Sequence, residues 1–229
     1  MRRARICEGR TLAAPMPTPE TASAPPARRR RRLVAATTAA IGTALLVATL
    51  RVPKGSIWFT VTGLLLAATW TIGAGLSGPL PLGRVAVAPR RRALLAAALL
   101  GAALFGGFVV ASIVGRHLPI SSGALRRVLA RADAGTSVTV LIVAVTNGAA
   151  EELFFRGAVY DAVGPSRPEL LTTLGYVVVT AASGNPALVV AALVMGAVFA
   201  LERRASGGVL ASIVTHVTWS TLMLRFLPR

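Results

Sequence analysis

Seven long apolar runs constrain this chain more than any other feature of its sequence. They cover residues 33–50, 57–76, 93–114, 138–155, 170–182, 187–201 and 209–226. A helix needs about 20 apolar residues to cross a bilayer, so these runs predict an all-α fold, a polytopic transmembrane helical bundle of about seven spans. Two of the runs, 170–182 and 187–201, are short. Either their helices extend beyond these bounds, or the two form a hairpin sheltered by the other helices.

The composition agrees with a membrane protein and argues against a soluble one. Hydrophobic residues make up 54% of the 229 and charged residues only 14%, which is too apolar for an ordinary soluble domain. A formal net charge of +17 would suit a nucleic-acid binder, but the basic residues cluster in the short segments between the apolar runs. That placement is typical of membrane-protein loops. We therefore expect contact with the lipid bilayer and no nucleic-acid partner.

The chain divides into three parts. Residues 1–32 are rich in Pro and Arg, lack hydrophobic periodicity, and are expected to form a disordered cytoplasmic tail. Residues 33–133 supply the N-terminal transmembrane helices, and residues 134–229 supply the core helices. The arginines of the expected inner loops outnumber those of the outer loops, which predicts a multi-pass protein of the plasma membrane with a cytoplasmic N-terminus. Residues 122–132 mix apolar and basic side chains at helical spacing, which predicts an interfacial helix.

Two adjacent acidic residues stand inside the fourth apolar run. Each would cost about 2.5–3.5 kcal/mol at the bilayer centre, and less near a helix end. Glu152 and Arg156 are four residues apart and share a helix face suited to an ion pair. Glu151 points about 100° away and is available to another partner. Such a carboxylate suits a general base or a proton carrier, and the alternative is an ion pair that only locks two helices.

The last apolar run carries His216, one of two histidines in the chain. At 1.5 Å per residue it lies roughly 10 Å inside its span, at a depth similar to that of Glu151. We therefore expect Glu151, Glu152 and His216 to converge in one cleft that opens toward the cytoplasmic side. The alternative is a histidine that only bridges helices. The other histidine, His117, precedes Pro119 in an outer loop and is not expected to reach the glutamates.

These residues resemble the motifs of a known family. The segment 151–157, E-E-L-F-F-R-G, matches the E-E-x-x-x-R motif of the CPBP family, the CAAX-protease and bacteriocin-processing (Abi) intramembrane metalloproteases. Residues 195–220, with His216, are similar to the last two core helices of that family, and the likeness covers about residues 134–226. The resemblance implies a membrane-embedded, metal-dependent endopeptidase that acts on a protein or peptide substrate at the membrane.

The resemblance also implies roles for individual residues. It assigns Glu151 to the activation of water, Arg156 to the orientation of Glu152, and His216 to metal binding or oxyanion stabilisation. The implied catalytic residues are Glu151, Glu152, Arg156 and His216. The implied cofactor is a divalent metal, zinc by preference, held by His216 and Glu151.

The second family motif, F-x-x-x-H, lacks its histidine in this chain. Tyr176 and Thr180 stand at its two positions, and Ser220 stands where the third motif has an asparagine. A hydrolytic zinc site usually uses three protein ligands, so this departure leaves two other interpretations open. One is a non-catalytic membrane scaffold or regulator of the same fold. The other is a small proton-coupled transporter, although the sequence has no visible inverted repeat.

Overall fold

The computed structural model describes residues 25–53, 56–83, 90–116 and 138–226. His117 and the expected interfacial helix at 122–132 lie outside these ranges, as do residues 1–24 of the expected tail. Within them, the regular elements are all helical. The elements are α1 (Pro25–Arg51), α2 (Ile57–Ser77), α3 (Arg90–Arg116), α5 (Val138–Glu152), the π-helix η2 (Leu153–Val159), α6 (Tyr160–Val163), α7 (Pro168–Ala181), α8 (Pro186–Ser206) and α9 (Leu210–Phe226).

Each predicted apolar run corresponds to one helical stretch, the fourth being the continuous run α5–η2–α6. Five stretches in the described ranges are long and apolar enough to cross a membrane, while α7 is a shorter apolar helix. Large apolar side chains such as Leu99 and Val178 remain exposed on these helices, where they can contact lipid. The all-α membrane bundle is thereby confirmed, and the chain is a multi-pass membrane protein.

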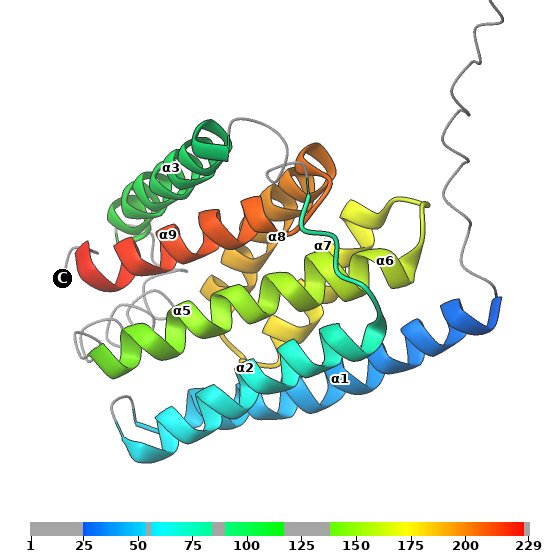
Figure 1. Ribbon diagram of the computed structural model, residues 1–229. Coiled ribbons are helices and arrows are strands. Elements are labelled where there is room, and N and C mark those ends of the chain that lie inside the picture. The colour runs from blue at the N-terminus through cyan, green and yellow to red at the C-terminus, as the bar shows by residue number, and fades with distance from the viewer. Residues whose placement is uncertain (1–24, 54–55, 84–89, 117–137, 227–229) are drawn as a thin grey trace, which may run out of the picture.

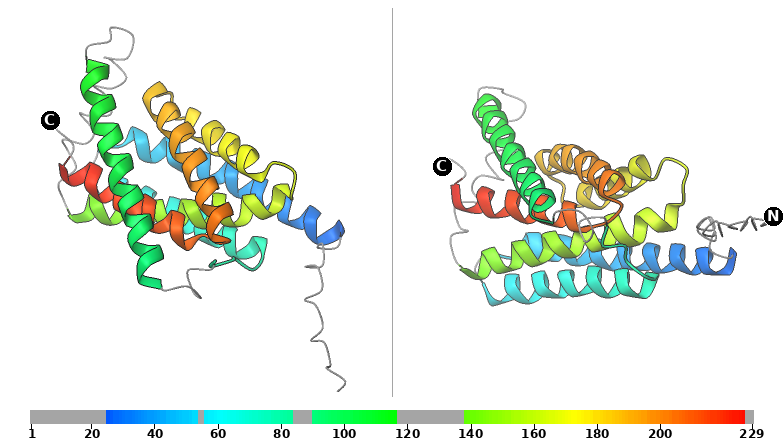
Figure 2. Two further views of the ribbon diagram at one scale, coloured as in Figure 1. Left: turned by 90° about the horizontal axis from the view of Figure 1, so that it is seen from above. Right: turned by 45° about the horizontal axis from the view of Figure 1, so that its top comes forward.

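The helices form two groups around α5. The helices α1 and α2 form an antiparallel hairpin, and α5 packs on α2 (Figure 1). On the other side of α5 lie α9 and the α7–α8 hairpin (Figure 1). The helix α3 crosses α9 and contacts the described bundle chiefly through it (Figure 2). Residues of α5 and η2 therefore face both groups, which places the E-E-x-x-x-R segment in the interior.

The N-terminal helix differs from the prediction. It begins at Pro25 and not at residue 33, so it includes the arginine run that we had placed in a disordered tail. Proline suits the first turn of a helix, and arginine is a good helix former. The run is also held by tertiary contacts, because Arg31 Nη1 lies 3.6 Å from Asp161 Oδ2 and Arg32 Nε donates to Ala162 O at 3.1 Å.

The two short apolar runs resolve differently. The helix α8 has 21 residues and ends at Ser206, well past residue 201, because the polar residues after 201 complete its last turns. The helix α7 has only 14 residues and packs against α8 as a hairpin. Leu170, Leu174 and Val190 are exposed on this hairpin, so the other described helices do not shelter it.

One end of the bundle gathers several arginines and their acidic partners. Arg31 and Arg203 both pair with Asp161, and Arg204 Nη1 lies 3.6 Å from Glu169 Oε1. The start of α1, the short α6, the start of α7 and the end of α8 therefore meet here, and we call this the arginine-rich end. Arg31, from the segment predicted to be cytoplasmic, thus lies on the same side of the molecule as Arg203 and Arg204. Which side of the membrane this is remains a prediction.

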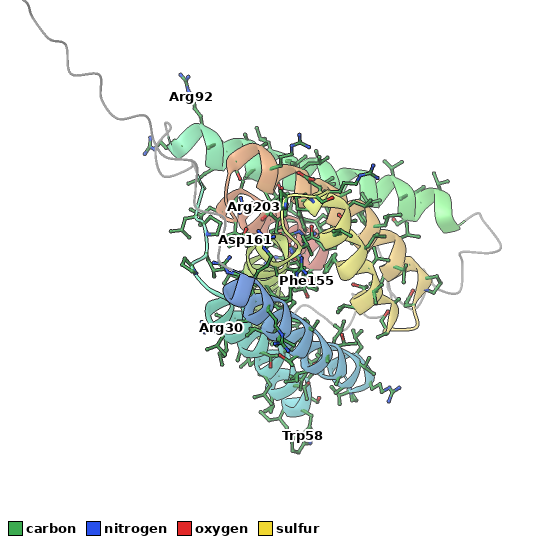
Figure 3. All side chains as sticks on the ribbon, turned by 90° about the vertical axis from the view of Figure 1, so that its right-hand side faces the viewer. Arg30, Trp58, Arg92, Phe155, Asp161 and Arg203 are labelled. Carbon is green, nitrogen blue, oxygen red and sulfur yellow. The ribbon has the colours of Figure 1, made fainter. Side chains whose placement is uncertain are left out.

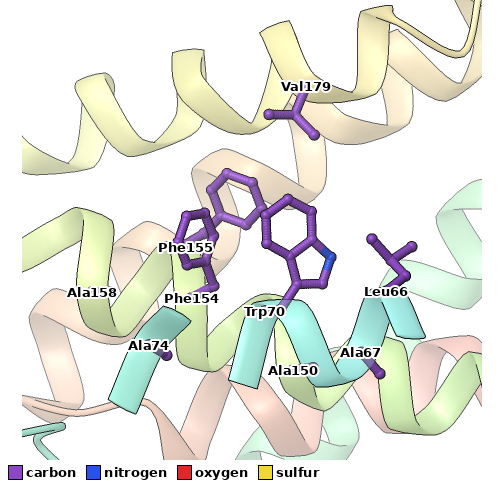
Figure 4. Close-up of a cluster of buried hydrophobic side chains, with 9 residues drawn as sticks. All are labelled: Leu66, Ala67, Trp70, Ala74, Ala150, Phe154, Phe155, Ala158 and Val179. Atoms are coloured by element: carbon purple, nitrogen blue, oxygen red, sulfur yellow. The ribbon is translucent and has the colours of Figure 1, made fainter. Parts of the chain in front are cut away.

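A cluster of aromatic side chains packs where α2 meets the E-E-x-x-x-R segment. The Trp70 ring on α2 stacks on the Phe154 ring with their centroids 4.7 Å apart, and the centroid of Phe155 lies 5.5 Å away (Figure 4). A Cβ atom at Gly42 would collide with the Trp70 ring, so the glycine lets α1 approach closely. Both α1 and α2 thus pack toward η2 around the Trp70 ring.

Candidate active site

The helix that carries the two glutamates changes type directly after them. The α-helical hydrogen bonding of α5 ends at Glu152 and gives way to the π-helix η2 over Leu153–Val159. Such π-helical turns are rare and often occur at functional sites, because they shift the residues that follow relative to those before. Arg156 lies within this turn.

Glu152 is the centre of a buried polar group. Arg156 Nη1 donates to Glu152 Oε1 at 3.1 Å, which forms the expected ion pair. His216 Nδ1, from α9, lies 3.1 Å from the same oxygen. The side chains of Glu152 and Arg156 are both 0% exposed. The other carboxylate oxygen, Oε2, is buried and has no hydrogen-bond partner in the described part of the chain.

His216 fits against α5 because that helix has a glycine at the contact. A Cβ atom at Gly148 would lie 3.2 Å from His216 Cδ2, closer than most side-chain contacts. On its other side the imidazole stacks on Phe199 of α8, with ring centroids 4.9 Å apart and an angle of 27° between the planes. The ring is thus held in one orientation, with Nδ1 toward Glu152.

Aromatic faces as well as Glu152 contact the Arg156 guanidinium. Its Cζ lies 4.9 Å from the centroid of the Tyr176 ring and 5.1 Å from that of Phe199, both cation–π distances. Its Nη2 donates to Gly196 O of α8 at 3.1 Å. A buried charge needs such compensation, and here three helices provide it.

Glu151 turns away from this pair, as its position on the helix predicted, and its partner is Tyr176. The Tyr176 hydroxyl, from α7, donates to Glu151 Oε2 at 2.8 Å. Glu151 is half-buried, in contrast to Glu152. Since the Tyr176 ring also lies against Arg156, the two glutamates belong to one connected group. We call it the glutamate–histidine cluster and define it as Glu151, Glu152, Arg156, Tyr176 and His216.

The structure therefore brings together the four residues predicted from the sequence and adds a fifth. Direct contact joins Glu152 to His216 and to Arg156, whereas Glu151 joins the group through Tyr176. Sequence reasoning noted Tyr176 only as the occupant of a motif position. The opening of a cleft toward the cytoplasm remains a prediction.

In the described part of the chain, the hydroxyl of Thr180 bonds to a backbone carbonyl and not to a side chain of the cluster. Thr180 Oγ1 donates to Tyr176 O of its own helix at 2.9 Å. Ser220 is buried one turn beyond His216.

The donor set does not fit a zinc site of three protein ligands. Within residues 25–53, 56–83, 90–116 and 138–226, no group of three or more His, Cys, Asp or Glu side chains is placed to hold a metal. Glu152 is already paired with Arg156 and His216, and Glu151 is bound by Tyr176. These side chains therefore do not support the metal cofactor that the family resemblance implies, and sensitivity to a chelator would test it.

Two charged residues of α8 lie beside the cluster and were missed as site residues. Glu202 Oε1 lies 2.7 Å from the hydroxyl of Thr215, the neighbour of His216. Arg203 Nε donates to the backbone carbonyl of Arg156 at 2.8 Å. Their position in the last turns of an apolar helix was the available signal, because charges inside such helices are costly and often functional.

Glu, Arg, Tyr and His side chains joined in the interior of a bundle of apolar helices define a class, namely membrane proteins with a buried polar site. The comparison with protein families gives a more specific result. Residues 133–222 match the sequence model of a family described as Type II CAAX prenyl endopeptidase Rce1-like. The matched segment runs from before α5 into α9 and contains the whole glutamate–histidine cluster, so the resemblance to the CAAX-protease family is confirmed over this part of the chain. No curated protein and no solved structure matches the chain.

Proposed function

We propose that this protein is a CAAX-protease-type endopeptidase that hydrolyses a peptide bond in a membrane-attached protein or peptide. The observation that carries the proposal is the 3.1 Å contact between His216 Nδ1 and the buried Glu152 carboxylate, inside the segment that matches the family. A histidine oriented by a buried carboxylate is an arrangement that hydrolytic enzymes use for proton transfer.

The two glutamates divide the work according to their surroundings. Glu151 is the more accessible carboxylate, and its hydrogen bond from Tyr176 engages only Oε2. Its Oε1 can accept a proton from the water that attacks the substrate carbonyl carbon. Glu152 is committed to Arg156 and His216, so its role is to orient the imidazole.

His216 completes the reaction at the leaving group. With Nδ1–H donated to Glu152, the protonated imidazole can give its Nε2 proton to the amine nitrogen as the carbon–nitrogen bond breaks. The water oxygen has by then bonded to the carbonyl carbon, and its proton rests on Glu151. Glu151 then releases that proton to water and His216 takes one up from water, which restores the starting state.

The test uses protein reconstituted in liposomes and a fluorogenic peptide that ends in a farnesylated CAAX sequence. The same peptide without the lipid measures the need for membrane attachment. Glu151→Gln and His216→Ala should each lower the hydrolysis rate by about 10²–10⁴-fold, the usual contribution of a general acid or base. Ile142→Ala, on an exposed face of α5, is the matched control and should retain the activity. If folded wild-type protein cleaves neither peptide, the proposal is wrong.

A non-catalytic scaffold of the same fold is the second candidate, and one observation favours it. Thr180, at the second-motif histidine position, turns its hydroxyl to its own helix and offers the cluster no second imidazole. This candidate predicts that a photoreactive form of the farnesylated peptide crosslinks to the protein and remains uncleaved. Crosslinking together with turnover would exclude it.

A further inference from the structure

Arg203 lies between the glutamate–histidine cluster and the arginine-rich end. It is only 8% exposed, although it stands in the last turn of α8. Its Nη2 lies 3.2 Å from Asp161 Oδ1, and its guanidinium carbon lies 4.8 Å from the centroid of the Tyr160 ring. Figure 3 labels Arg203 and Asp161 close to each other at this end. A buried arginine held on two sides has little freedom to move.

The third contact of Arg203 is made with the π-helix. In an α-helix the amide of Tyr160 would bond to the carbonyl of Arg156. Here the Tyr160 amide bonds instead to the carbonyls of Phe155 and Gly157. The Arg156 carbonyl therefore loses its usual donor, and Arg203 Nε takes that place at 2.8 Å. Buried carbonyls are rarely left without a donor, so this bond favours the π-helical form of the segment over the α-helical one.

The helix α8 thus holds Arg156 at two points. Gly196 O accepts from the Arg156 guanidinium, and seven residues later Arg203 donates to the Arg156 backbone. The guanidinium in turn bonds to the Glu152 oxygen that contacts His216. A return of η2 to α-helical geometry would turn Arg156 relative to Glu152 and disturb that shared oxygen.

We propose that Arg203 is a positioning residue, which keeps η2 in the π-helical form that places Glu152 against His216. The effect on catalysis rests on the proposed function. The effect on the Glu152–His216 contact does not, and the two can be measured separately.

The experiment compares Arg203→Ala with Arg204→Ala. Arg204 is the matched control because it is the next residue, carries the same charge, and has a side chain that is 70% exposed and paired with Glu169. Protein labelled with ¹⁵N-histidine in a His117→Ala background reports on His216 alone, since the chain has two histidines. Arg203→Ala should shift the imidazole resonances of His216, and Arg204→Ala should leave them unchanged.

Turnover of the farnesylated peptide supplies the second measurement. Arg203→Ala should lower kcat by about 10- to 100-fold, the scale of a small misplacement of catalytic groups, with little change in KM. His216 resonances that stay unchanged in Arg203→Ala overturn the proposal, whatever the activity. If the His216 resonances shift in Arg203→Ala but the wild-type protein cleaves no peptide, the positioning role is supported and the proposed function is contradicted.

Arg203→Lys covers the case in which the alanine variant does not fold. A lysine keeps the charge for Asp161, but its single amino group cannot occupy the places of both Nε and Nη2. The His216 resonances should therefore still shift, by less than in a folded alanine variant. A spectrum identical to that of the wild type would show that the bond to the Arg156 carbonyl does not matter.

Discussion

Glu152 and Glu151 are neighbours in the chain, yet they stand in different surroundings. Glu152 is fully buried and neutralises Arg156, which is also fully buried. Replacing Glu152 by methionine would leave that guanidinium without its counter-charge, an effect of about 3–5 kcal/mol on the free energy of unfolding. Replacing the half-buried Glu151 would remove one hydrogen bond to a charged group, worth about 1.5–3 kcal/mol. We therefore expect Glu152→Met to be the more destabilising change.

Unfolding by SDS in mixed micelles, followed by circular dichroism, measures the difference. The double variant Glu152→Met/Arg156→Met completes a thermodynamic cycle. It should recover most of the stability lost in Glu152→Met, because it removes the stranded charge and places an apolar chain between the Tyr176 and Phe199 rings. Ile142→Ala, on an exposed face of α5, controls for general effects of substitution.

Two results would refute this reasoning. If Glu151→Met and Glu152→Met unfold at the same SDS fraction, burial and the ion pair do not distinguish the two glutamates. If the double variant is as unstable as the sum of its two single variants, Arg156 is not stranded by the loss of Glu152, and the 3.1 Å contact contributes little.

Three further predictions concern topology, packing and metal. Cysteines introduced within residues 28–32 should be labelled by a membrane-impermeant reagent only from the cytoplasmic side. Labelling from outside would show that the predicted orientation is wrong. Gly148→Ala should lower peptide hydrolysis because a Cβ there would press on His216, while Gly175→Ala, with open space around it, should not; equal activities would contradict the close contact. Hydrolysis should withstand 1,10-phenanthroline, because the donor set does not fit a three-ligand site; inhibition that added zinc reverses would restore the metal interpretation.

The helices were predictable because each follows from a local pattern, an apolar run of nearly spanning length. Their ends were less predictable, because tertiary contacts set them. The arginine run at the start of α1 looks like a solvated tail in isolation, and its bonds to Asp161 and Ala162 lie far along the chain. The helix α8 likewise extends past its apolar run, and its last turn carries Arg203, which bonds to Asp161 and to the Arg156 carbonyl elsewhere in the chain.

The site divides in the same way. The pair Glu152 and Arg156 could be read from a spacing of four residues, and the free direction of Glu151 from the rotation per residue. The contact of Tyr176 with Glu151 could not be predicted from the sequence. The two residues are 25 positions apart, and only the packing of α7 beside η2 brings them together. The π-helix has no sequence signature either, since it depends on a donor from another helix.

The tryptophan between α2 and η2 has a consequence for biosynthesis. Trp70 and the helices around it leave the ribosome well before Phe154, the ring on which it stacks. At about 5–20 residues per second, the α1–α2 hairpin waits several seconds in the membrane before Phe154 can cover its side of this indole. During that time the early hairpin presents an unfinished face to lipid, to chaperones or to neighbouring nascent chains. Cells that lack a membrane insertase or chaperone able to cover such a face should lose this protein at the α1–α2 stage, before the glutamate–histidine cluster has been made.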